Sequence, residues 1–391
     1  MKLLRTLPTR RLAVLLSAVV AVSVAAGMIA VTAFGGGGAT PPPKPLADAL
    51  HDAATATRPA GVTARVTFTN RLFPSGALLG QTGSALMSGA SGRLWATNDG
   101  RGRLELQSDA GDVQIVWRGD KLTVYDASAN TVYEATIPAA TKTGNDNGTP
   151  PSLDQITTWL AKLGEQAAIS AAQPDNVAGQ PAYRVTISPK HDGGLLGSAE
   201  LSWDAATGVP LRVAVYAQGS SAPVLELTAT DISYGAVSSA SVDVSPPSGA
   251  KVVDLGGAHT DHGSGNGSQP SVTSVDAVQA AILFPLVAPD TLVGLPRKTV
   301  QLLDSGGSKG ALIVYGEGLG ALVVVERPAA AQGQGNKQLD ALPKVSIGGA
   351  TGHELATPLA TVLTFDRTGV SYLLAGSLPS AAAEAAAREL G

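Results

Sequence analysis

The sequence predicts an α+β protein in which a large antiparallel β-sheet comes first and a smaller α+β unit follows. Two observations predict the sheet, because residues 112–137 and 199–235 each hold successive runs of alternating apolar side chains with only turn residues between them. A third observation separates the two units. Residues 256–270 are rich in Gly, Ser and His and show no apolar periodicity, as expected of a linker.

The first of these runs is expected to form a β-meander. Val113, Ile115 and Trp117 share one face of its first strand by the two-residue period of a strand. Residues 119–120 supply a turn, and Val132 is expected to continue the same face further along. The meander therefore predicts a sheet with one apolar face.

The second run repeats this pattern. Leu201 and Trp203 share a face before a turn, and Leu211 and Val213 resume it after the turn. The chain thus predicts two sets of hairpins that can join in one sheet.

The other elements follow from apolar spacing and turn residues. In the first unit, we expect a helix at 46–57 and strands at 62–71, 78–87, 92–96 and 102–107. In the second unit, we expect a helix at 275–284, strands at 298–303, 311–315, 321–326, 351–355, 361–366 and 370–375, and a closing helix at 380–390.

A further helix is expected at residues 152–166. Ser152 is a good N-cap, and Leu153, Ile156 and Leu160 form one apolar stripe beside Trp159. An amphipathic helix of this kind ordinarily covers a sheet.

The composition limits the possible functions. With 391 residues, of which 44% are hydrophobic, the chain is long enough for two cores. A net charge of -4, with no Lys/Arg run beyond the N-terminus, argues against a nucleic-acid partner. The absence of cysteine excludes disulfides and a lipid-bearing lipobox cysteine.

The N-terminus predicts a membrane address. Four basic residues within the first 11 positions precede the uncharged residues 12–34, which are long enough as a helix to cross a bilayer. The positive charges favour a cytoplasmic N-terminus, so we expect a single-pass cell-membrane protein with the bulk of the chain extracytoplasmic. The alternative is a signal segment cleaved after Ala33, which would release a secreted protein.

The predicted organisation has five segments. They are the anchor or signal at 1–34, a Gly/Pro stalk at 35–45, the sheet domain at 46–255, the linker at 256–270 and the C-terminal α+β domain at 271–391.

Three segments of the sheet domain resemble the LolA/LolB and RseB superfamily of extracytoplasmic lipoprotein carriers. They are GDKLTVYDASANTV at 119–132, WDAATGVPLR at 203–212 and PPSGAKVV at 246–253. The resemblance implies a half-open, curved antiparallel β-barrel with lid helices and a wide apolar trough. It makes the helix at 152–166 a candidate lid, with Leu153, Ile156, Trp159 and Leu160 as its contacts. The end of the chain also resembles the C-terminal domain of RseB-type regulators.

The candidate ligand-binding residues are the apolar side chains that recur at the period of a strand. They are Trp95, Leu104, Leu106, Ile115, Trp117, Leu122, Val124, Leu201, Trp203, Leu211, Val213, Val215, Leu225 and Leu227. Such a row ordinarily forms a packed core, whereas the resemblance favours a cavity for acyl chains.

Motifs that suggest catalysis lack the required context. Residues 306–310 fit the letters of a nucleophile elbow, but a strand-like run follows where a helix is needed. Residues 316–320 fail as a dinucleotide loop for the same reason. His259, Asp261 and His262 could offer metal ligands, but they lie in the linker without a fourth ligand. We therefore expect a non-enzyme with no catalytic residue, metal or cofactor.

These observations predict a membrane-anchored protein that binds a lipid or an acylated protein in an apolar trough. A regulator like RseB, which binds an anti-sigma factor, is the first alternative. A structural envelope interaction domain with a fully packed sheet is the second.

Overall fold

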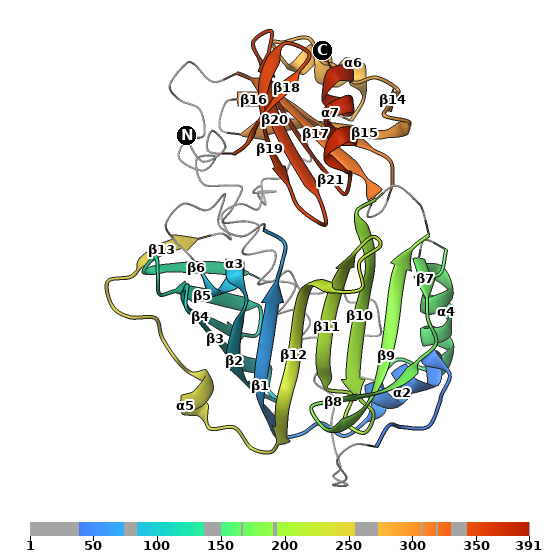
Figure 1. Ribbon diagram of the computed structural model, residues 1–391, viewed down its shortest axis with the longest axis vertical. Coiled ribbons are helices and arrows are strands. Elements are labelled where there is room, and N and C mark those ends of the chain that lie inside the picture. The colour runs from blue at the N-terminus through green and yellow to red at the C-terminus, as the bar shows by residue number, and fades with distance from the viewer. Residues whose placement is uncertain are drawn as a thin grey trace, which may run out of the picture.

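A computed structural model describes residues 39–73, 84–136, 150–165, 167–190, 194–254, 273–305, 308–317, 320–329 and 342–390. Two β-sheets organise these residues, and Figure 1 shows the second sheet beyond one end of the first. They lie on either side of the proposed linker at 256–270, whose residues fall outside those described.

The first sheet has 13 strands in the order β13-β6-β5-β4-β3-β2-β1-β12-β11-β10-β9-β7, with β8 also paired to β9. The strands are β1 (Gly61–Asn70), β2 (Ala90–Thr97), β3 (Arg101–Ser108), β4 (Gly111–Arg118), β5 (Lys121–Asp126), β6 (Thr131–Thr136), β7 (Ala167–Ile169), β8 (Gln173–Val177), β9 (Gln180–Pro189), β10 (Leu196–Asp204), β11 (Pro210–Ala217), β12 (Pro223–Tyr234) and β13 (Lys251–Asp254). All pairs are antiparallel except β13 with β6. Two hairpin series therefore meet where β1 pairs with β12, and Figure 1 shows the β3–β6 side turning away from the β9–β12 side.

Four helices accompany this sheet in the described chain: α2 (Leu46–Thr55), α3 (Ala85–Ser88), α4 (Leu153–Leu163) and α5 (Ser239–Val242). The period of two sorts the side chains of the strands onto two faces. We call the face that carries Val62, Ala64 and Val66 of β1 the inner face, because these side chains are buried in the main core. The opposite side is the outer face.

The second sheet has eight strands in the order β14-β15-β16-β17-β21-β20-β19-β18. They are β14 (Thr291–Leu292), β15 (Leu295–Ser305), β16 (Ser308–Tyr315), β17 (Leu322–Pro328), β18 (Lys344–Ile347), β19 (Ala350–Ala356), β20 (Thr361–Arg367) and β21 (Val370–Gly376). The helices α6 (Val275–Ala281) and α7 (Ser380–Glu389) pack against it. Alternating apolar residues, such as Leu322 and Val324 of β17, face these helices in a separate core.

The two sheets touch at one end of β10. The backbone N–H of Leu195 donates to the carbonyl oxygen of Ser377 at 3.0 Å and to its Oγ at 2.9 Å. Leu359 of the second unit also packs against the core of the first sheet. The C-terminal unit is thus in contact with the half-open sheet.

The predicted α+β fold, a half-open antiparallel sheet followed by a smaller α+β unit, is confirmed. The expected strand at 78–87 is wrong at its end, because Ala85–Ser88 is the short helix α3. The Ser84 side chain accepts a hydrogen bond from the Leu86 N–H and so caps this helix. Ala85 and Leu86 are buried over the inner face, which favours the helix over a strand.

The register of β6 also differs from the expectation. Val124 pairs with Tyr133, and Val132 pairs with Tyr125, so Tyr133 and not Val132 continues the inner face. The left-handed backbone of Asn130, with a φ of 42°, precedes this strand in the turn from β5. If a turn is one residue longer or shorter, the two sets of side chains of the next strand exchange faces. Apolar spacing alone did not determine the length of the turn between β5 and β6.

The localisation prediction requires correction. Within the described ranges, no helix has both the length and the apolar character needed to cross a membrane. The expected span at 12–34 lies outside the described residues, as does the cleavage position at Ala33. We therefore do not assign the chain to the cell membrane as a single-pass protein.

The proposed stalk is in part ordered against the sheet. The carbonyl of Pro42 accepts a hydrogen bond from the Tyr183 hydroxyl at 2.8 Å, and the Ala39 carbonyl accepts one from the Asn176 side chain at 3.2 Å. Lys44 forms an antiparallel bridge with Ala172. Residues 39–44 thus run beside β8 and are not a free spacer.

Candidate functional site

The centre of the inner face holds a small apolar cavity of about 60 Å³. It is lined by β1, β2, β11 and β12, and the register places Ala64 beside Ile232 and Val66 beside Ala229. Ala96 of β2 also lines it. Since these strands contribute mainly Ala and Val here, their short side chains leave a space that longer ones would fill.

Larger side chains fill the inner face next to this cavity. Leu104, Ile115, Trp117 and Leu122 of β3, β4 and β5 are each about 1% exposed. Gly102 lies opposite Trp117, and a Cβ atom at Gly102 would stand 1.9 Å from an indole carbon. The glycine therefore lets the indole ring lie flat on β3.

The short helix α3 packs over this part of the inner face. Leu86 is buried in the same core as Ile115, and α3 contacts β1, β3 and β4. Asn70, at the end of β1, holds this cover in place. Its amide Nδ2 donates to the Leu86 carbonyl at 2.6 Å, and its Oδ1 accepts from the Leu72 N–H at 2.8 Å.

The structure brings most of the predicted trough residues together on the inner face. Register and core packing place there Leu104, Leu106, Ile115, Trp117, Leu122, Val124, Leu211, Val213, Val215, Leu225 and Leu227. Of these, Leu211, Val213 and Leu227 line the cavity itself. A role in ligand binding stays a prediction for all of them.

Trp95 does not belong to this group. It pairs with Thr63 and Arg103 on the outer face, and the Arg103 guanidinium carbon lies 5.3 Å from the centre of its ring. The Trp95 indole therefore makes a cation–π contact away from the trough. Sequence reasoning placed it inside because Trp is usually buried, whereas the alternation with buried Leu94 and Ala96 turns it outward.

Leu201 and Trp203 lie on the inner face, but the helix α2 covers them. Trp203 is 3% exposed and packs in a separate cluster with Tyr183 and Ala49, the last of which belongs to α2. The helix α2 thus closes the β9 and β10 end of the inner face. These two residues contribute to the core under α2 and do not line the cavity.

The predicted lid helix forms but packs against α2. In α4, the Ser152 side chain and the Gln155 side chain make reciprocal hydrogen bonds in a capping box. Ile156 is buried, whereas Leu153 is 40% exposed and Trp159 is 57% exposed. The helix therefore does not bury its whole apolar stripe, and Figure 1 shows it beside the β7 edge of the sheet.

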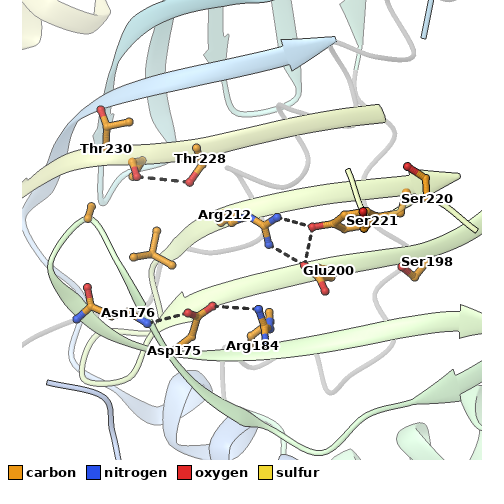
Figure 2. A pocket seen from close by; sticks show the side chains of 14 residues that line it. Asp175, Asn176, Arg184, Ser198, Glu200, Arg212, Ser220, Ser221, Thr228 and Thr230 are labelled. Atoms are coloured by element: carbon orange, nitrogen blue, oxygen red, sulfur yellow. Dashed lines mark hydrogen bonds and ion pairs between the residues drawn. The ribbon is translucent and has the colours of Figure 1, made fainter. Parts of the chain in front are cut away.

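A larger pocket, of about 660 Å³, lies on the outer face of β9–β12 (Figure 2). Glu200 of β10 and Arg212 of β11 form its floor, and Arg184 comes from β9. Asp175 and Val177 of the β8–β9 hairpin form one wall. The lining is thus mainly polar, in contrast to the inner face.

Arg212 is the centre of a network in this pocket. Its Nη1 donates to Glu200 Oε2 at 2.7 Å, its Nε donates to Glu226 Oε1 at 2.6 Å and its Nη2 donates to the Tyr216 hydroxyl at 2.6 Å. Burial alone would raise the pKa of Glu200, but hydrogen bonds from Arg212 and Tyr216 outweigh it and hold that pKa below its ordinary value. The pair is therefore charged and rigid near neutral pH.

Sequence reasoning missed these polar residues because it followed only the apolar half of the alternation. The available signal was the other half of the same strands, where Glu200 and Ser202 alternate with Leu201, and Arg212 alternates with Leu211. Residues of opposite charge on one face of neighbouring strands indicate a polar face whose side chains can bind one another.

The structure gives no sign of a metal site in the part of the chain that it describes. No group of three or more His, Asp or Glu side chains lies close enough to hold an ion there, and His259, Asp261 and His262 fall outside that part. Ser308 begins β16 directly after β15, so a helix does not follow it. Between Tyr315 and Leu322, the described residues 316–317 and 320–321 likewise form no α-helix whose N-terminus could meet a phosphate.

No protein-family model matches the chain, and a search of curated proteins finds no match.

The chain is similar to solved structures at low identity. The complex of Pseudomonas aeruginosa MucA and MucB matches with a TM-score of 0.45 and 15% identity, over 88% of this chain and 96% of that chain. MucB in complex with MucA(peri) matches with a TM-score of 0.42 and 14% identity, over 84% of this chain and 91% of that chain. A putative outer membrane lipoprotein-sorting protein domain from Vibrio parahaemolyticus has a TM-score of 0.23 and 12% identity, over 51% of this chain and 96% of that chain.

Proposed function

We propose that this chain is a non-enzymatic binding protein that takes the acyl chain of a lipid, or of an acylated protein, on the inner face of its half-open sheet. The observation that carries the proposal is the apolar cavity between β2, β1, β12 and β11. Ala64, Ala96 and Ala229 keep it open at the centre of the sheet, where a core would be filled by larger side chains.

The energetics favour an acyl chain as the ligand. Each methylene group moved from water to an apolar site contributes about 0.8 kcal/mol. Apart from Arg212, whose guanidinium is hydrogen-bonded to Glu200 and Glu226, the residues that line the cavity have apolar side chains and offer no hydrogen bonds to a polar ligand. An apolar chain is therefore the ligand that this face can bind.

Binding of a whole chain requires the cavity to enlarge. At about 60 Å³, it is well below the volume of roughly 300 Å³ at which small-molecule pockets begin. We expect the cavity to extend along the inner face beneath α3, a single short helix that packs over the adjoining core and is held there by the hydrogen bonds of Asn70. We expect Leu72 and Leu86 to leave the inner face together when a chain enters.

A fluorescent fatty acid tests the proposal. The purified protein is titrated with the probe, and lipid extracts of the protein are measured by mass spectrometry. Ala96→Trp places a large side chain in the cavity, and we expect it to weaken probe binding at least tenfold. Ser91→Trp on the exposed outer face of the same strand is the matched control and should bind as the unmodified protein does.

A second cavity variant protects the test against loss of folding, since overpacking can itself destabilise. Ala229→Leu adds less volume than Ala96→Trp and should weaken binding of the probe by a smaller factor. Thermal unfolding of the variant checks that it is folded. No saturable uptake by the unmodified protein, together with no co-purified lipid, would contradict the proposal. That result would favour the alternative of a structural interaction domain whose sheet is fully packed.

The first alternative function, that of a regulator which binds an anti-sigma factor, stays a prediction that rests on the sequence resemblance. MucA is the partner of MucB in the solved complexes, and that pairing is a property of MucB.

A further inference from the structure

The pocket on the outer face lies across the β-sheet from the proposed acyl site, and only Arg212 and Ala229 line both. The floor residues Glu200 and Arg212 pair across β10 and β11 with residues of the outer face, whereas Leu201 and Val213 point the other way. Its volume, about 660 Å³, lies within the range of small-molecule sites. The inference therefore does not depend on the proposed function.

The charges that line this pocket are balanced. Arg212 pairs with Glu200 and Glu226 and also donates to the Tyr216 hydroxyl, and Arg184 faces Asp175. A carboxylate or phosphate ligand would meet the carboxylates of Asp175 and Glu200, and a cation would meet the two guanidinium groups. A neutral ligand would be repelled by neither the carboxylates nor the guanidinium groups.

The pairing of Arg184 is incomplete. Its Nη2 donates to Gln173 Oε1 at 3.2 Å, but its Nη1 lies 3.9 Å from Asp175 Oδ2, which is beyond hydrogen-bond distance, and its buried Nε has no partner among the described residues. A hydroxyl group fits this gap because it can accept from the guanidinium and donate to the carboxylate at once. A carbonyl oxygen could do only the first.

Hydroxyl side chains surround the same space. Ser198 of β10, Thr228 and Thr230 of β12, and Ser221 of the β11–β12 connection line it, and Figure 2 shows them around the Glu200 and Arg212 pair. Each can donate and accept, so together they can bind a ligand with several hydroxyl groups.

The strand edges do not favour a peptide. β10, β11 and β12 are paired on both edges, so they offer no free backbone groups to an added strand. β8 pairs with β9 on one edge, and residues 39–44 run beside it. An extended peptide would lack the main-chain hydrogen bonds by which it is usually held.

We propose that the outer-face pocket is a binding site for a neutral, hydroxyl-rich ligand, with the chemistry of a saccharide. Arg184 and Asp175 hold one hydroxyl between them, and the Glu200 and Arg212 pair orients the floor against which the sugar ring lies. The role is binding, and no bond of the ligand is broken.

Calorimetric titration of the full chain with maltose and with chitobiose tests this proposal. We expect saturable binding of a neutral disaccharide and at least tenfold weaker binding of its charged counterparts, such as a uronic acid disaccharide. Arg184→Met removes the donors while keeping the side-chain length, and it should reduce affinity at least tenfold. Arg93→Met, at an exposed outer-face arginine of β2 away from the pocket, is the matched control and should leave affinity unchanged.

A loop variant separates lost binding from lost folding. Ser221 is exposed at the mouth of the pocket, so Ser221→Trp should obstruct it without disturbing the sheet, and it too should reduce affinity at least tenfold. Absence of saccharide binding at millimolar concentration would overturn the proposal. So would saccharide binding by both pocket variants that is as tight as that of the unmodified protein, or selective binding of an unstructured peptide.

Discussion

Asn70 and Leu86 join the end of β1 to the helix α3 through a buried hydrogen bond, with 2.6 Å between the Asn70 Nδ2 and the Leu86 carbonyl oxygen. The same side chain accepts from the Leu72 N–H at 2.8 Å, so one amide binds both Leu72 and Leu86, whose side chains are buried in the main core. Asn70 is 7% exposed, which places these bonds out of reach of water. This single residue therefore holds α3 over the part of the inner face that adjoins the proposed acyl site.

Replacing Asn70 by Ala should loosen the cover. Each buried backbone group left unpaired costs about 1–3 kcal/mol, so we expect a lower free energy of unfolding and faster uptake of a fatty acid probe. Urea denaturation and stopped-flow fluorescence measure the two effects. Asn98→Ala, at an exposed turn residue, is the control. Unchanged uptake with reduced stability would show that α3 is not the gate.

Replacing Gly102 by Ala should strain the inner face. The added Cβ would stand 1.9 Å from an indole carbon of Trp117, so the ring or the strand must shift. Overpacking of this kind costs about 1–3 kcal/mol, which thermal unfolding will detect. Gly235→Ala meets nothing within 4 Å and should stay within about 0.5 kcal/mol of the unmodified protein. Equal effects of the two changes would contradict the packing described here.

The buried carboxyl of Glu326 should make the stability depend on pH. Glu326 is fully buried in the core of the second sheet, its Oε2 accepts from the Val287 N–H at 3.1 Å, and burial raises its pKa to about 7. Because the folded state holds this proton more tightly than the unfolded state, the stability is greatest below the unfolded pKa near 4.5. It falls as the pH rises through about 7, by on the order of 3 kcal/mol.

Glu326→Gln should remove this dependence, since the amide stays neutral and can still accept from Val287. Urea denaturation from pH 4.5 to pH 8 should show the variant to be the more stable protein at pH 8 and little changed at pH 4.5. Glu165→Gln, at an exposed carboxyl, serves as the matched control. A variant with the same slope as the unmodified protein would exclude Glu326 as the titrating group.

The two faces of α4 should respond differently to truncation. Ile156 is 7% exposed, so Ile156→Ala should lower the free energy of unfolding by about 2–5 kcal/mol. Trp159 is 57% exposed, and Trp159→Ala should change it by no more than about 0.5 kcal/mol. If Trp159→Ala loses the fatty acid probe faster while its stability is unchanged, the exposed side of α4 takes part in ligand binding. If probe retention is also unchanged, α4 only packs against α2 and has no role as a lid.

The strand pattern predicted much of the fold. Alternating apolar residues such as Ile115 and Trp117 located most strands of both sheets, and Ser152 located the start of α4, whereas β9, β13, β14 and β18 were not predicted. The short strands β7 and β8 lacked such a signal, because Gln173–Val177 carries polar residues and a proline where alternation would be read. The helix α3 was missed because four residues are too few for a helical period to be seen.

The sequence by itself determined which residues alternate, and therefore the sheet-rich architecture and its apolar rows, because the side-chain period of a strand is a local property. Only the tertiary structure decided which row faces which neighbour. The pairing of β1 with β12 brings Ala64 beside Ile232, and the folding of the β8–β9 hairpin brings Asp175 to Arg184. Register and hairpin placement join residues far apart in the chain, so no window of the sequence could show that the outer face holds the larger pocket.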